Sequence, residues 1–463
     1  MHYVENRVED VRIAYVGGGS RGWAWGLMSD LVSAGDMSGT VALYDIDRRA
    51  AENNAVIGEL FNSAEGAVSE WRYRVEDTLD GALKGADFVV ISILPGTFRE
   101  MASDVHTPEK YGIYQSVGDT TGPGGIIRAL RTIPMFETIA RAIERCCPDA
   151  WVINYTNPMT VCVRTLYKTF PKIKAFGCCH EVFGTQGLLA AAYEEITGDE
   201  RPGRAQVKVN VVGVNHFTWL TSAHYRNVDL FPIYEEFIGR YGKDGYSKGI
   251  AQSDYNRRFA CDHRVKFDLF RRYGSIAAAG DRHLAEFCEG KWYLGSPEQV
   301  RSWGFGLTEV AWRVDDLNNR LEKSRKYLSG ELKPIIKRTG EDGVNQMRAL
   351  SGLRDFVTNV NLPNRGQIAD LPEDAVVETN AVFSCDGVRP VVSGALPQRI
   401  RGLVSRIVSE QETVAEAGVR RDLGLAFSAF ANDPLVTADT VTARRLFDEM
   451  VENTREYLTE YIG

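Results

Sequence analysis

Residues 12–22 read RIAYVGGGSRG, and this stretch decides the fold of the N-terminal half. Its apolar beginning, residues 12–16, is typical of a buried strand that stops at glycine. The glycines at 17, 19 and 22 fit the spacing G-x-G-x-x-G. The first permits a tight turn, the second lets the backbone approach a pyrophosphate, and the third brings a helix close to the strand. A helix that begins here also presents free N–H groups to such an anion. The stretch predicts a dinucleotide site formed by Gly17, Gly18, Gly19, Ser20 and Gly22.

A carboxylate follows the second apolar run. VALY at residues 41–44 ends at Asp45, which lies about 20 residues beyond the glycines, where an acidic side chain can bond the hydroxyls of an adenosine ribose. The same charge repels a 2′-phosphate, so the sequence predicts NAD rather than NADP as the cofactor. Asp47, a little further on, is the alternative ribose ligand.

Short apolar runs and helical stretches alternate through the first third of the chain. Further strands are expected at residues 87–93 and 151–153, and apolar residues recur with a helical period over residues 126–143. Short strands separated by helices indicate a parallel sheet with crossover helices. The predicted fold class is α/β, a Rossmann-type doubly wound parallel sheet that resembles the lactate and malate dehydrogenases.

The character of the chain changes near residue 195. Later elements are expected as a strand at 207–214, helices at 232–241, 265–273 and 302–328, a strand-rich stretch at 356–392 and closing helices. The predicted organisation is an NAD-binding domain over residues 1–195 and a C-terminal α+β domain over residues 196–463. The second domain is expected to bind the substrate and to form a homo-oligomer, a dimer or a tetramer.

The composition excludes several classes of protein. The chain has 463 residues, or about three average domains. Its net charge is −8 and no basic stripe interrupts the acidic background, which argues against a nucleic-acid partner. No apolar run approaches the roughly 20 residues of a membrane span, and no signal peptide is expected at the N-terminus. The 8 cysteines are too sparse for a disulfide scaffold, so the expected location is the cytoplasm.

The segment NYTNP at residues 154–158 follows the fourth expected strand. In open α/β sheets, ligands bind outside the carboxyl ends of the strands. Asn157 is therefore expected to bond a nicotinamide ribose or a substrate hydroxyl. A plain Asx turn before the proline is the alternative.

The segment GCCHEV at residues 177–182 clusters thiols, an imidazole and a carboxylate, and His216 is a further candidate ligand. The separation of Cys179 and His216 along the chain does not fit a zinc finger. Two protein ligands alone would leave positions for substrate oxygens on a metal. Free cysteines are usually buried apolar residues, however, so the spacing by itself does not decide between the two interpretations.

Further motifs are spread along nearly the whole chain. They are GGGS at 17–20, DID at 45–47, DTTGPGG at 119–125, RTIP at 131–134, NYTNPM at 154–159, GCCHEV at 177–182, GVNH at 213–216, VNLPNRGQIADLPEDAVVE at 360–378 and NDPL at 432–435. Together they resemble glycoside hydrolase family 4. The resemblance implies an NAD-dependent and divalent-metal-dependent glycosidase, one of the exceptions to hydrolysis by two carboxylates.

By this resemblance, Cys179 and His216 hold the metal, usually manganese, while Cys178 is structural. Cobalt and nickel also suit a thiolate and an imidazole. The tetrapeptide C-H-E-V at residues 179–182 resembles the α-galacturonidases, and the absence of D-M-P or N-V-P after the cysteine argues against a 6-phosphosugar. The implied function is hydrolysis of unphosphorylated α-galacturonides. Another α-glycosidase of the family, an α-glucosidase or α-galactosidase, is the alternative.

The resemblance also implies how the sugar reacts. Hydride transfer from C3 to NAD⁺ makes the C2 proton acidic, and the metal stabilises the enolate that forms when a base removes this proton. The C1–O bond then breaks by elimination, and water addition and re-reduction complete the hydrolysis. Asp281, in G-D-R-H at residues 280–283, is the implied base, with Tyr255 and Tyr273 as alternatives. His180 stands where related enzymes place an acid, and either donates a proton or only bonds the substrate or a metal ligand.

Two further substrate contacts are expected. Asp119 stands where the family often has the glutamate of Q-E-T-x-G, and its shorter side chain is expected to reach the sugar. The carboxylate of a galacturonide needs a cation, and arginine binds carboxylates bidentately. Arg282 is the first candidate, with Arg99 and His283 next, although each is equally expected as a surface or salt-bridge residue.

The rival interpretations are an NAD-dependent 2-hydroxyacid dehydrogenase and a nucleotide-binding sensor without turnover. The long C-terminal half and the lack of a G-x-H-G-D segment argue against the dehydrogenase. The Cys179–His216 pair argues against the sensor, which needs no metal for a substrate.

Overall fold

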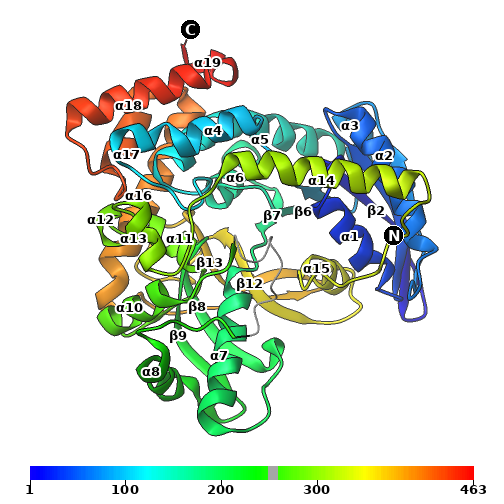
Figure 1. The fold of residues 1–463 in the computed structure, drawn as a ribbon. Helices are drawn as coiled ribbons and strands as arrows, with labels where there is room; N and C mark the ends of the chain where they lie inside the picture. Colours follow the sequence, from blue (N-terminus) through cyan, green and yellow to red (C-terminus); the bar gives the residue numbers. More distant parts are fainter. Residues whose placement is uncertain (249–258, 463) are drawn as a thin grey trace.

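The protein is built around one large mixed sheet, as seen in a computed structural model that describes residues 1–248 and 259–462 (Figure 1). The parallel centre of the sheet has the strand order β4-β3-β2-β5-β6-β7. These strands are β2 (Arg7–Val16), β3 (Met37–Tyr44), β4 (Trp71–Val75), β5 (Phe88–Ile91), β6 (Trp151–Asn154) and β7 (Lys174–Gly177). Counted along the chain, this is the order of doubly wound dinucleotide-binding folds, so the predicted fold class is confirmed.

Helices cover both faces of these strands, which explains their continuous apolar runs, because a parallel sheet is buried on both sides. Every residue of β5 is buried. The helices of this half are α1 (Trp23–Val32), α2 (Arg48–Asn62), α3 (Leu79–Leu83), α4 (Phe98–His106), α5 (Gly122–Cys146), α6 (Met159–Thr169) and α7 (Glu181–Thr197). Short elements complete it: β1 (His2–Val4), η1 (Pro108–Tyr111) and η2 (Arg204–Gln206).

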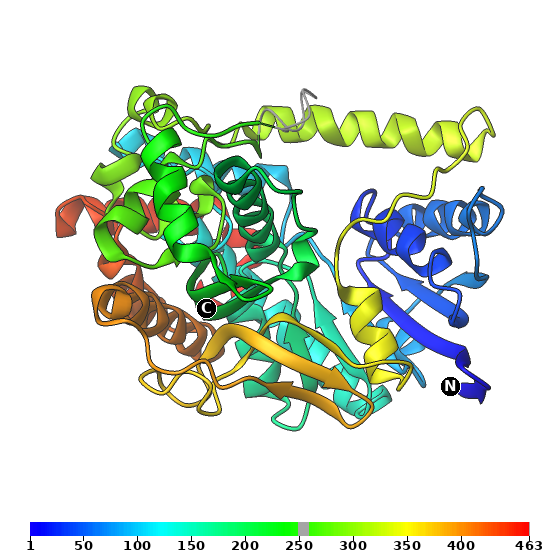
Figure 2. The same ribbon diagram turned by 90° about the horizontal axis from the view of Figure 1, so that it is seen from below.

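Strands from the C-terminal half extend the same sheet. They are β12 (Phe356–Pro363), β13 (Val376–Ser384) and β14 (Gly387–Pro390), all antiparallel to their neighbours. Asn361 of β12 pairs with Gly177 of β7, and Figure 2 shows the yellow and orange strands beside the teal ones. The sheet therefore contains strands from both sides of the boundary expected near residue 195.

A second, four-stranded sheet and a group of helices complete the C-terminal half. Its strands are β8 (Val207–Val214), β9 (Phe217–Tyr225), β10 (Val228–Asp229) and β11 (Ile276–Ala277). The helices are α8 (Leu230–Tyr241), α10 (Arg264–Tyr273), α11 (Asp281–Glu286), α12 (Gly290–Tyr293), α13 (Pro297–Ser302), α14 (Val310–Leu328), α15 (Gly343–Leu350), α16 (Gln398–Arg420), α17 (Leu423–Asn432), α18 (Thr440–Asn453), η3 (Arg455–Tyr457) and α19 (Thr459–Ile462).

The helix expected over residues 302–328 begins only at Val310, so its predicted start is wrong. Gly304 has φ +76°, in the left-handed region, and the chain from there to Glu309 is not helical. A glycine in this conformation ends a helix rather than continuing it.

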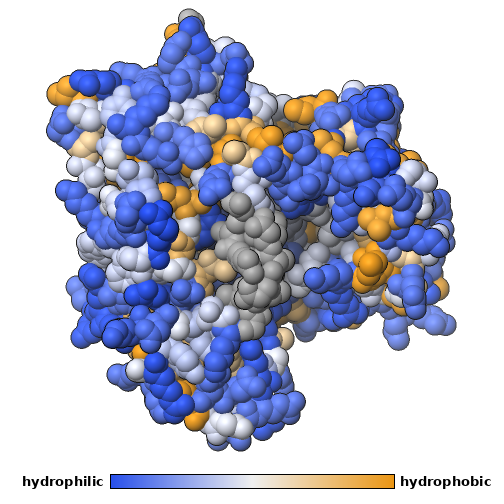
Figure 3. All heavy atoms as spheres, viewed as in Figure 1, coloured by the Kyte–Doolittle hydropathy of each residue, from blue (hydrophilic) through white to orange (hydrophobic). Residues whose placement is uncertain are grey.

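The surface seen in Figure 3 is mostly hydrophilic, with apolar side chains gathered in small patches. No helix within residues 1–248 and 259–462 is long and apolar enough to cross a membrane. The cysteines are all unpaired.

Candidate active site

The glycine turn after β2 has a geometry that only glycine fits. Gly17 has φ +92°, and a Cβ added there would lie 2.1 Å from the carbonyl oxygen of Ser92. The N–H groups of Gly17 and Gly18 both donate to the carbonyl oxygen of Tyr44 at 2.9 Å. The turn is thereby tied to the end of β3, where the predicted ribose ligand lies.

Asp45 faces this turn. Its Oδ2 accepts from the N–H of Gly19 at 2.8 Å, and its Oδ1 accepts from the N–H of Asp47 at 2.9 Å. Asp47 instead caps α2, because its Oδ1 accepts from the N–H of Ala50 at 3.1 Å. Ile46 is 96% exposed and leaves an apolar surface beside the turn. Asp45, rather than Asp47, is therefore the carboxylate that faces the glycine turn.

Asp119, His216 and His283 converge from distant parts of the chain. Their potential ligand atoms all lie within 4.8 Å of one another, and the two imidazole rings lie 3.7 Å apart between centres. Asp119 precedes α5, His216 lies between β8 and β9, and His283 belongs to α11. Two imidazole nitrogens and a carboxylate oxygen form a donor set that suits a divalent transition metal.

Thr120 fixes the tautomer of His216. Its hydroxyl donates to Asp119 Oδ1 at 2.7 Å and lies 2.9 Å from His216 Nδ1. A hydroxyl has one proton to donate, so His216 Nδ1–H is the donor in the second bond and Nε2 keeps its lone pair. Burial, together with His283, lowers the pKa of His216 to about 3. His216 therefore offers a neutral ring nitrogen to a metal near neutral pH.

Asp119 is ionised and has an amide beside it. Burial would raise the pKa of Asp119, but the Arg128 guanidinium and the two imidazoles hold it at about 2. Asn157 Nδ2 donates to Asp119 Oδ2 at 3.4 Å, and Arg128 Nε donates to the Asn157 carbonyl oxygen at 3.1 Å. Asn157 Oδ1 is buried without a hydrogen-bond partner among the described residues. Buried acceptors are nearly always satisfied, so this oxygen points to a donor on a bound ligand.

Cys179 follows β7 and is not a member of the three-residue group. The Asn359 side chain donates both to the Cys179 carbonyl oxygen at 3.4 Å and to Glu378 at 2.6 Å. Glu378 also accepts from Asn215 at 3.3 Å, the residue before His216. Burial raises the pKa of the Cys179 thiol well above its ordinary value, so a thiolate there needs a cation close by. Glu378 thus links the segments that carry the two sequence-predicted metal ligands.

Asp281 is the first residue of α11 and faces the start of α10, outside that group. Its two carboxylate oxygens accept from the N–H groups of Val265 and Lys266, both at 3.1 Å. Burial raises the pKa of Asp281 to about 6, although the buried Lys266 ammonium opposes the shift. Among the alternative bases, Tyr273 packs against the C-terminal core, and Tyr255 lies outside the described residues.

His180 lies on the side of the site that faces the glycine turn. Its side chain is 54% exposed, and its Nδ1 lies 2.9 Å from Glu341 Oε1. Its ring centre lies 6.4 Å from that of Trp23, the first residue of α1. The hydrogen bond to Glu341 raises the pKa of His180 to about 9, so the imidazole is protonated near neutral pH. An exposed, protonated imidazole is able to donate a proton.

The two candidate arginines differ in placement. Arg99 is 63% exposed at its side chain and forms an ion pair with Glu456 at 2.7 Å, so it belongs to the surface. Arg282 is buried, donates to Thr308 Oγ1 at 2.8 Å and lines a cavity of about 680 Å³. Burial lowers the pKa of Arg282 to about 10, which still leaves it cationic. The structure brings Arg282, and not Arg99, toward the interior.

Comparison with known proteins identifies the family. The sequence model described as Family 4 glycosyl hydrolase matches residues 12–195, and the model of its C-terminal domain matches residues 211–436. The chain belongs to glycoside hydrolase family 4. The family predicted from the motifs is thereby confirmed.

Relatives within family 4 match over the full length. The alpha-galacturonidase of Thermoanaerobacterium saccharolyticum is 59% identical, over 99% of this chain and 98% of its own length. That of Bacillus subtilis is 53% identical, over 96% of this chain and 98% of its own. The crystal structure of the Bacillus subtilis glucosidase lplD has a TM-score of 0.91 and 53% identity, and the match covers 96% of this chain and 100% of that one.

Several residues of this family 4 site could not be found from the sequence. Glu181 accepts from the N–H of Gly280 at 2.6 Å and lies 3.7 Å from His283. Glu286 accepts from the N–H groups before Asp119, at 2.7 and 2.9 Å. The C-H-E-V tetrapeptide is the one sequence signal that points to Glu181. Burial of a charged side chain depends on tertiary packing, which the sequence does not show. Arg128, Thr120 and Glu378 were missed for the same reason.

Proposed function

We propose that this family 4 chain is an α-galacturonidase, which hydrolyses unphosphorylated α-linked galacturonides. The observation that carries the proposal is identity of 59%, 55% and 51% over 99% of the chain to relatives named alpha-galacturonidase. The C-H-E-V tetrapeptide at residues 179–182 and the inward placement of the Arg282 cation support the same substrate class.

We propose NAD as the cofactor and the glycine turn as its binding site. The turn fits a dinucleotide because Gly17 and Gly19 leave no room for side chains. A Cβ on Gly19 would lie 2.8 Å from Asp45 Oδ2. Asp45, which accepts from the N–H of Gly19, is the proposed partner of the ribose hydroxyls, and its charge opposes a 2′-phosphate. Ser20, Gly18 and Gly22 supply further backbone at the start of α1, where N–H groups face an anion.

We propose that Cys179 and His216 hold a divalent metal, with manganese as the first choice and cobalt or nickel as alternatives. His216 fits because it offers a neutral nitrogen and has ligand atoms of Asp119 and His283 within 4.8 Å, whereas Cys179 is included on the strength of the family motif. Bound at these residues, NAD would supply a hydride acceptor for C3 of the sugar, and a divalent metal would supply Lewis-acid polarisation of the sugar oxygens.

The chain's own side chains would hold the sugar. Asn157, whose Oδ1 has no partner among the described residues, suits a donor hydroxyl of the substrate. Asp119 is ionised and suits a second donor hydroxyl of the substrate. Arg282 and His283 are the proposed contacts of the galacturonate carboxylate, and Arg99 is less suited because its side chain lies at the surface.

Proton transfer is assigned to two groups. Asp281 is the proposed base at C2, and its pKa of about 6 suits a base that works near neutral pH. His180 is the proposed acid at the leaving oxygen, since Glu341 keeps it protonated. Both groups would act on atoms on the same sugar ring.

A screen of 4-nitrophenyl glycosides with catalytic NAD⁺, Mn²⁺ and a reductant tests this function. We expect release of nitrophenol from the α-galacturonide, without accumulation of NADH. The α-galactoside, the α-glucoside and the 6-phospho-α-glucoside serve as comparisons. Cleavage of the 6-phosphoglycoside without cleavage of the galacturonide would contradict the proposal, and NADH accumulation without nitrophenol would favour a dehydrogenase.

A further inference from the structure

Helix α14 of the C-terminal half lies across the cofactor turn of the N-terminal half. Figures 1 and 2 both show it reaching over to α1 and α2, and it packs against α2 and α4. Tyr327, near its end, is buried and meets Trp25 of α1 edge-on, with 5.5 Å between ring centres. Ser324, one turn earlier, is also buried. One face of α14 is thus fixed against α1.

Arg320 lies on this same face, because it precedes Tyr327 by two helical turns. Its Nη1 donates to the carbonyl oxygen of Arg21 at 3.3 Å, and its Nε donates to Asp316 at 2.7 Å. A Cβ on Gly22 would lie 2.2 Å from this Nη1. The guanidinium therefore rests directly on the last glycine of the turn.

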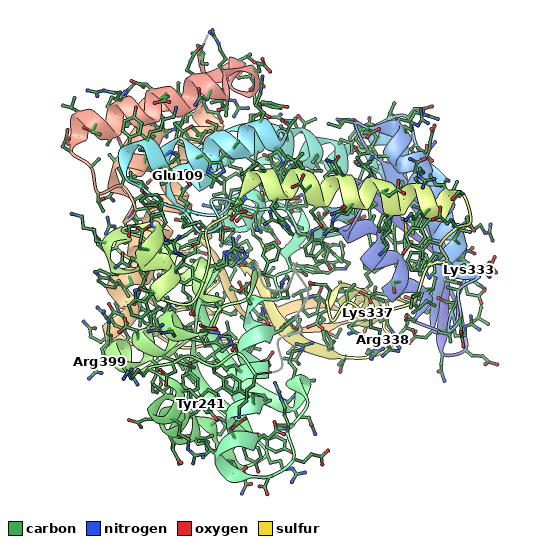
Figure 4. The ribbon with its side chains drawn as sticks, in the orientation of Figure 1. Glu109, Tyr241, Lys333, Lys337, Arg338 and Arg399 are labelled. Carbon is green, nitrogen blue, oxygen red and sulfur yellow. The ribbon has the colours of Figure 1, made fainter. Side chains whose placement is uncertain are left out.

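The segment that follows α14 holds this arrangement in place. The N–H of Lys337 donates to Ser29 Oγ at 2.8 Å, and the N–H of Thr339 donates to Asp30 at 2.9 Å, both on α1. Figure 4 labels Lys337 on this segment, beside α1 and α15. These hydrogen bonds to α1 hold α14, and with it Arg320, over the turn.

We infer that Arg320 is a cofactor-binding residue that donates to the pyrophosphate of the dinucleotide. The inference rests on the NAD binding proposed above. The start of α1 offers N–H groups to an anion, and arginine binds phosphate through a planar fork of donors. Asp316 orients this fork through Nε, and Nη2 has no hydrogen-bond partner among the residues that the structure describes. The Arg21 side chain instead lies 3.4 Å from Asp47, which leaves Arg320 as the cation over Gly22.

Arg320→Gln tests the inference through binding alone, without turnover. Arg325→Gln is the matched control, because Arg325 lies on the same helix but is 60% exposed and pairs with Glu322 at 2.7 Å. Dissociation constants for NAD⁺ and ADP-ribose are measured by calorimetry, and adenosine binding by competition in ligand-observed NMR. We expect Arg320→Gln to weaken NAD⁺ and ADP-ribose by about 10- to 100-fold, the loss typical of a charge-assisted hydrogen bond. Adenosine binding and the Arg325→Gln variant are expected to match wild type.

The outcomes separate this inference from the proposed function. Arg320→Lys should recover part of the NAD⁺ affinity, because it restores the charge without the fork. Wild-type NAD⁺ affinity in Arg320→Gln would overturn the inference. So would an equal loss for adenosine, since Arg320 would then only order the turn. A wild-type protein that binds no NAD⁺ would instead overturn the proposed function on which the inference rests.

Discussion

Binding of Mn²⁺ to this protein is expected to release one proton, and Cys179 is expected to be its source. Burial raises the pKa of this thiol well above its ordinary value, so the free protein carries the protonated form. Asp119 has a pKa of about 2 and His216 a pKa of about 3, so both are already deprotonated near neutral pH and release no proton when the metal binds. One proton per metal makes the affinity rise about tenfold, or about 1.4 kcal/mol, for each pH unit. From about pH 6 to about pH 8 the Kd should therefore fall about 100-fold.

The perturbation is Cys179→Ser, which removes the titrating group. We expect its Kd for Mn²⁺ to be weaker and to change little over the same pH range. Free Mn²⁺ is measured by electron paramagnetic resonance, and calorimetry in buffers of different protonation enthalpy counts the protons released. His224→Ala is the control, because His224 is an exposed histidine of β9 and should leave both quantities unchanged.

A wild-type Kd that stays constant from about pH 6 to about pH 8 would refute the thiolate ligand. The metal would then be held by Asp119, His216 and His283. His283→Ala distinguishes the remaining arrangements. Even a residue that only supports a ligand costs about 10- to 100-fold in metal affinity when it is lost, so an unchanged Kd would show that His283 neither binds the metal nor supports a metal ligand.

Three other outcomes are expected. Asp45→Asn should narrow the preference for NAD⁺ over NADP⁺ in binding titrations, because it removes the charge that repels a 2′-phosphate. Arg282→Ala should lower kcat/KM for the α-galacturonide about 10- to 150-fold and should lower kcat/KM for an α-galactoside less. Arg99→Ala is the control and should leave kcat/KM unchanged for both substrates. Equal losses on both substrates in Arg282→Ala would make Arg282 a positioning residue. Because Asp281 must be ionised to act as a base, kcat/KM should rise with pH through about 6, and Asp281→Asn should abolish turnover without loss of NAD⁺ binding.

The shape of the glycine turn could be predicted from the sequence because its determinants are local. The strand, the glycines and Asp45 lie within one βαβ unit. The glycine spacing predicts a tight turn, and Gly17 has the positive φ and the lack of room for a Cβ that such a turn requires. The difference between the expected and the observed start of α14 also has a local cause. The periodic spacing of apolar residues does not indicate that Gly304 adopts the left-handed conformation, which interrupts the helix.

The convergence of Asp119, His216 and His283 could not be predicted, because it depends on how distant segments pack. The sequence offers Arg282 as the first candidate for the carboxylate clamp, with Arg99 and His283 next. The structure separates the two arginines, with Arg99 paired at the surface to Glu456 and Arg282 buried beside Thr308. Burial of a charged side chain is decided by tertiary contacts that no periodicity records.

The large sheet connects the two halves of the chain that carry the proposed site. The glycine turn that we propose for NAD lies after β2, whereas His216 and His283 come from the C-terminal half. β12 pairs with β7, so without the C-terminal half β7 would have an unpaired edge. Asn359 of β12 reaches the Cys179 backbone and Glu378 of β13, and Glu378 in turn binds Asn215 beside His216. The β7–β12 pairing and this chain of hydrogen bonds therefore join the half that carries the glycine turn to the half that carries the proposed ligand His216.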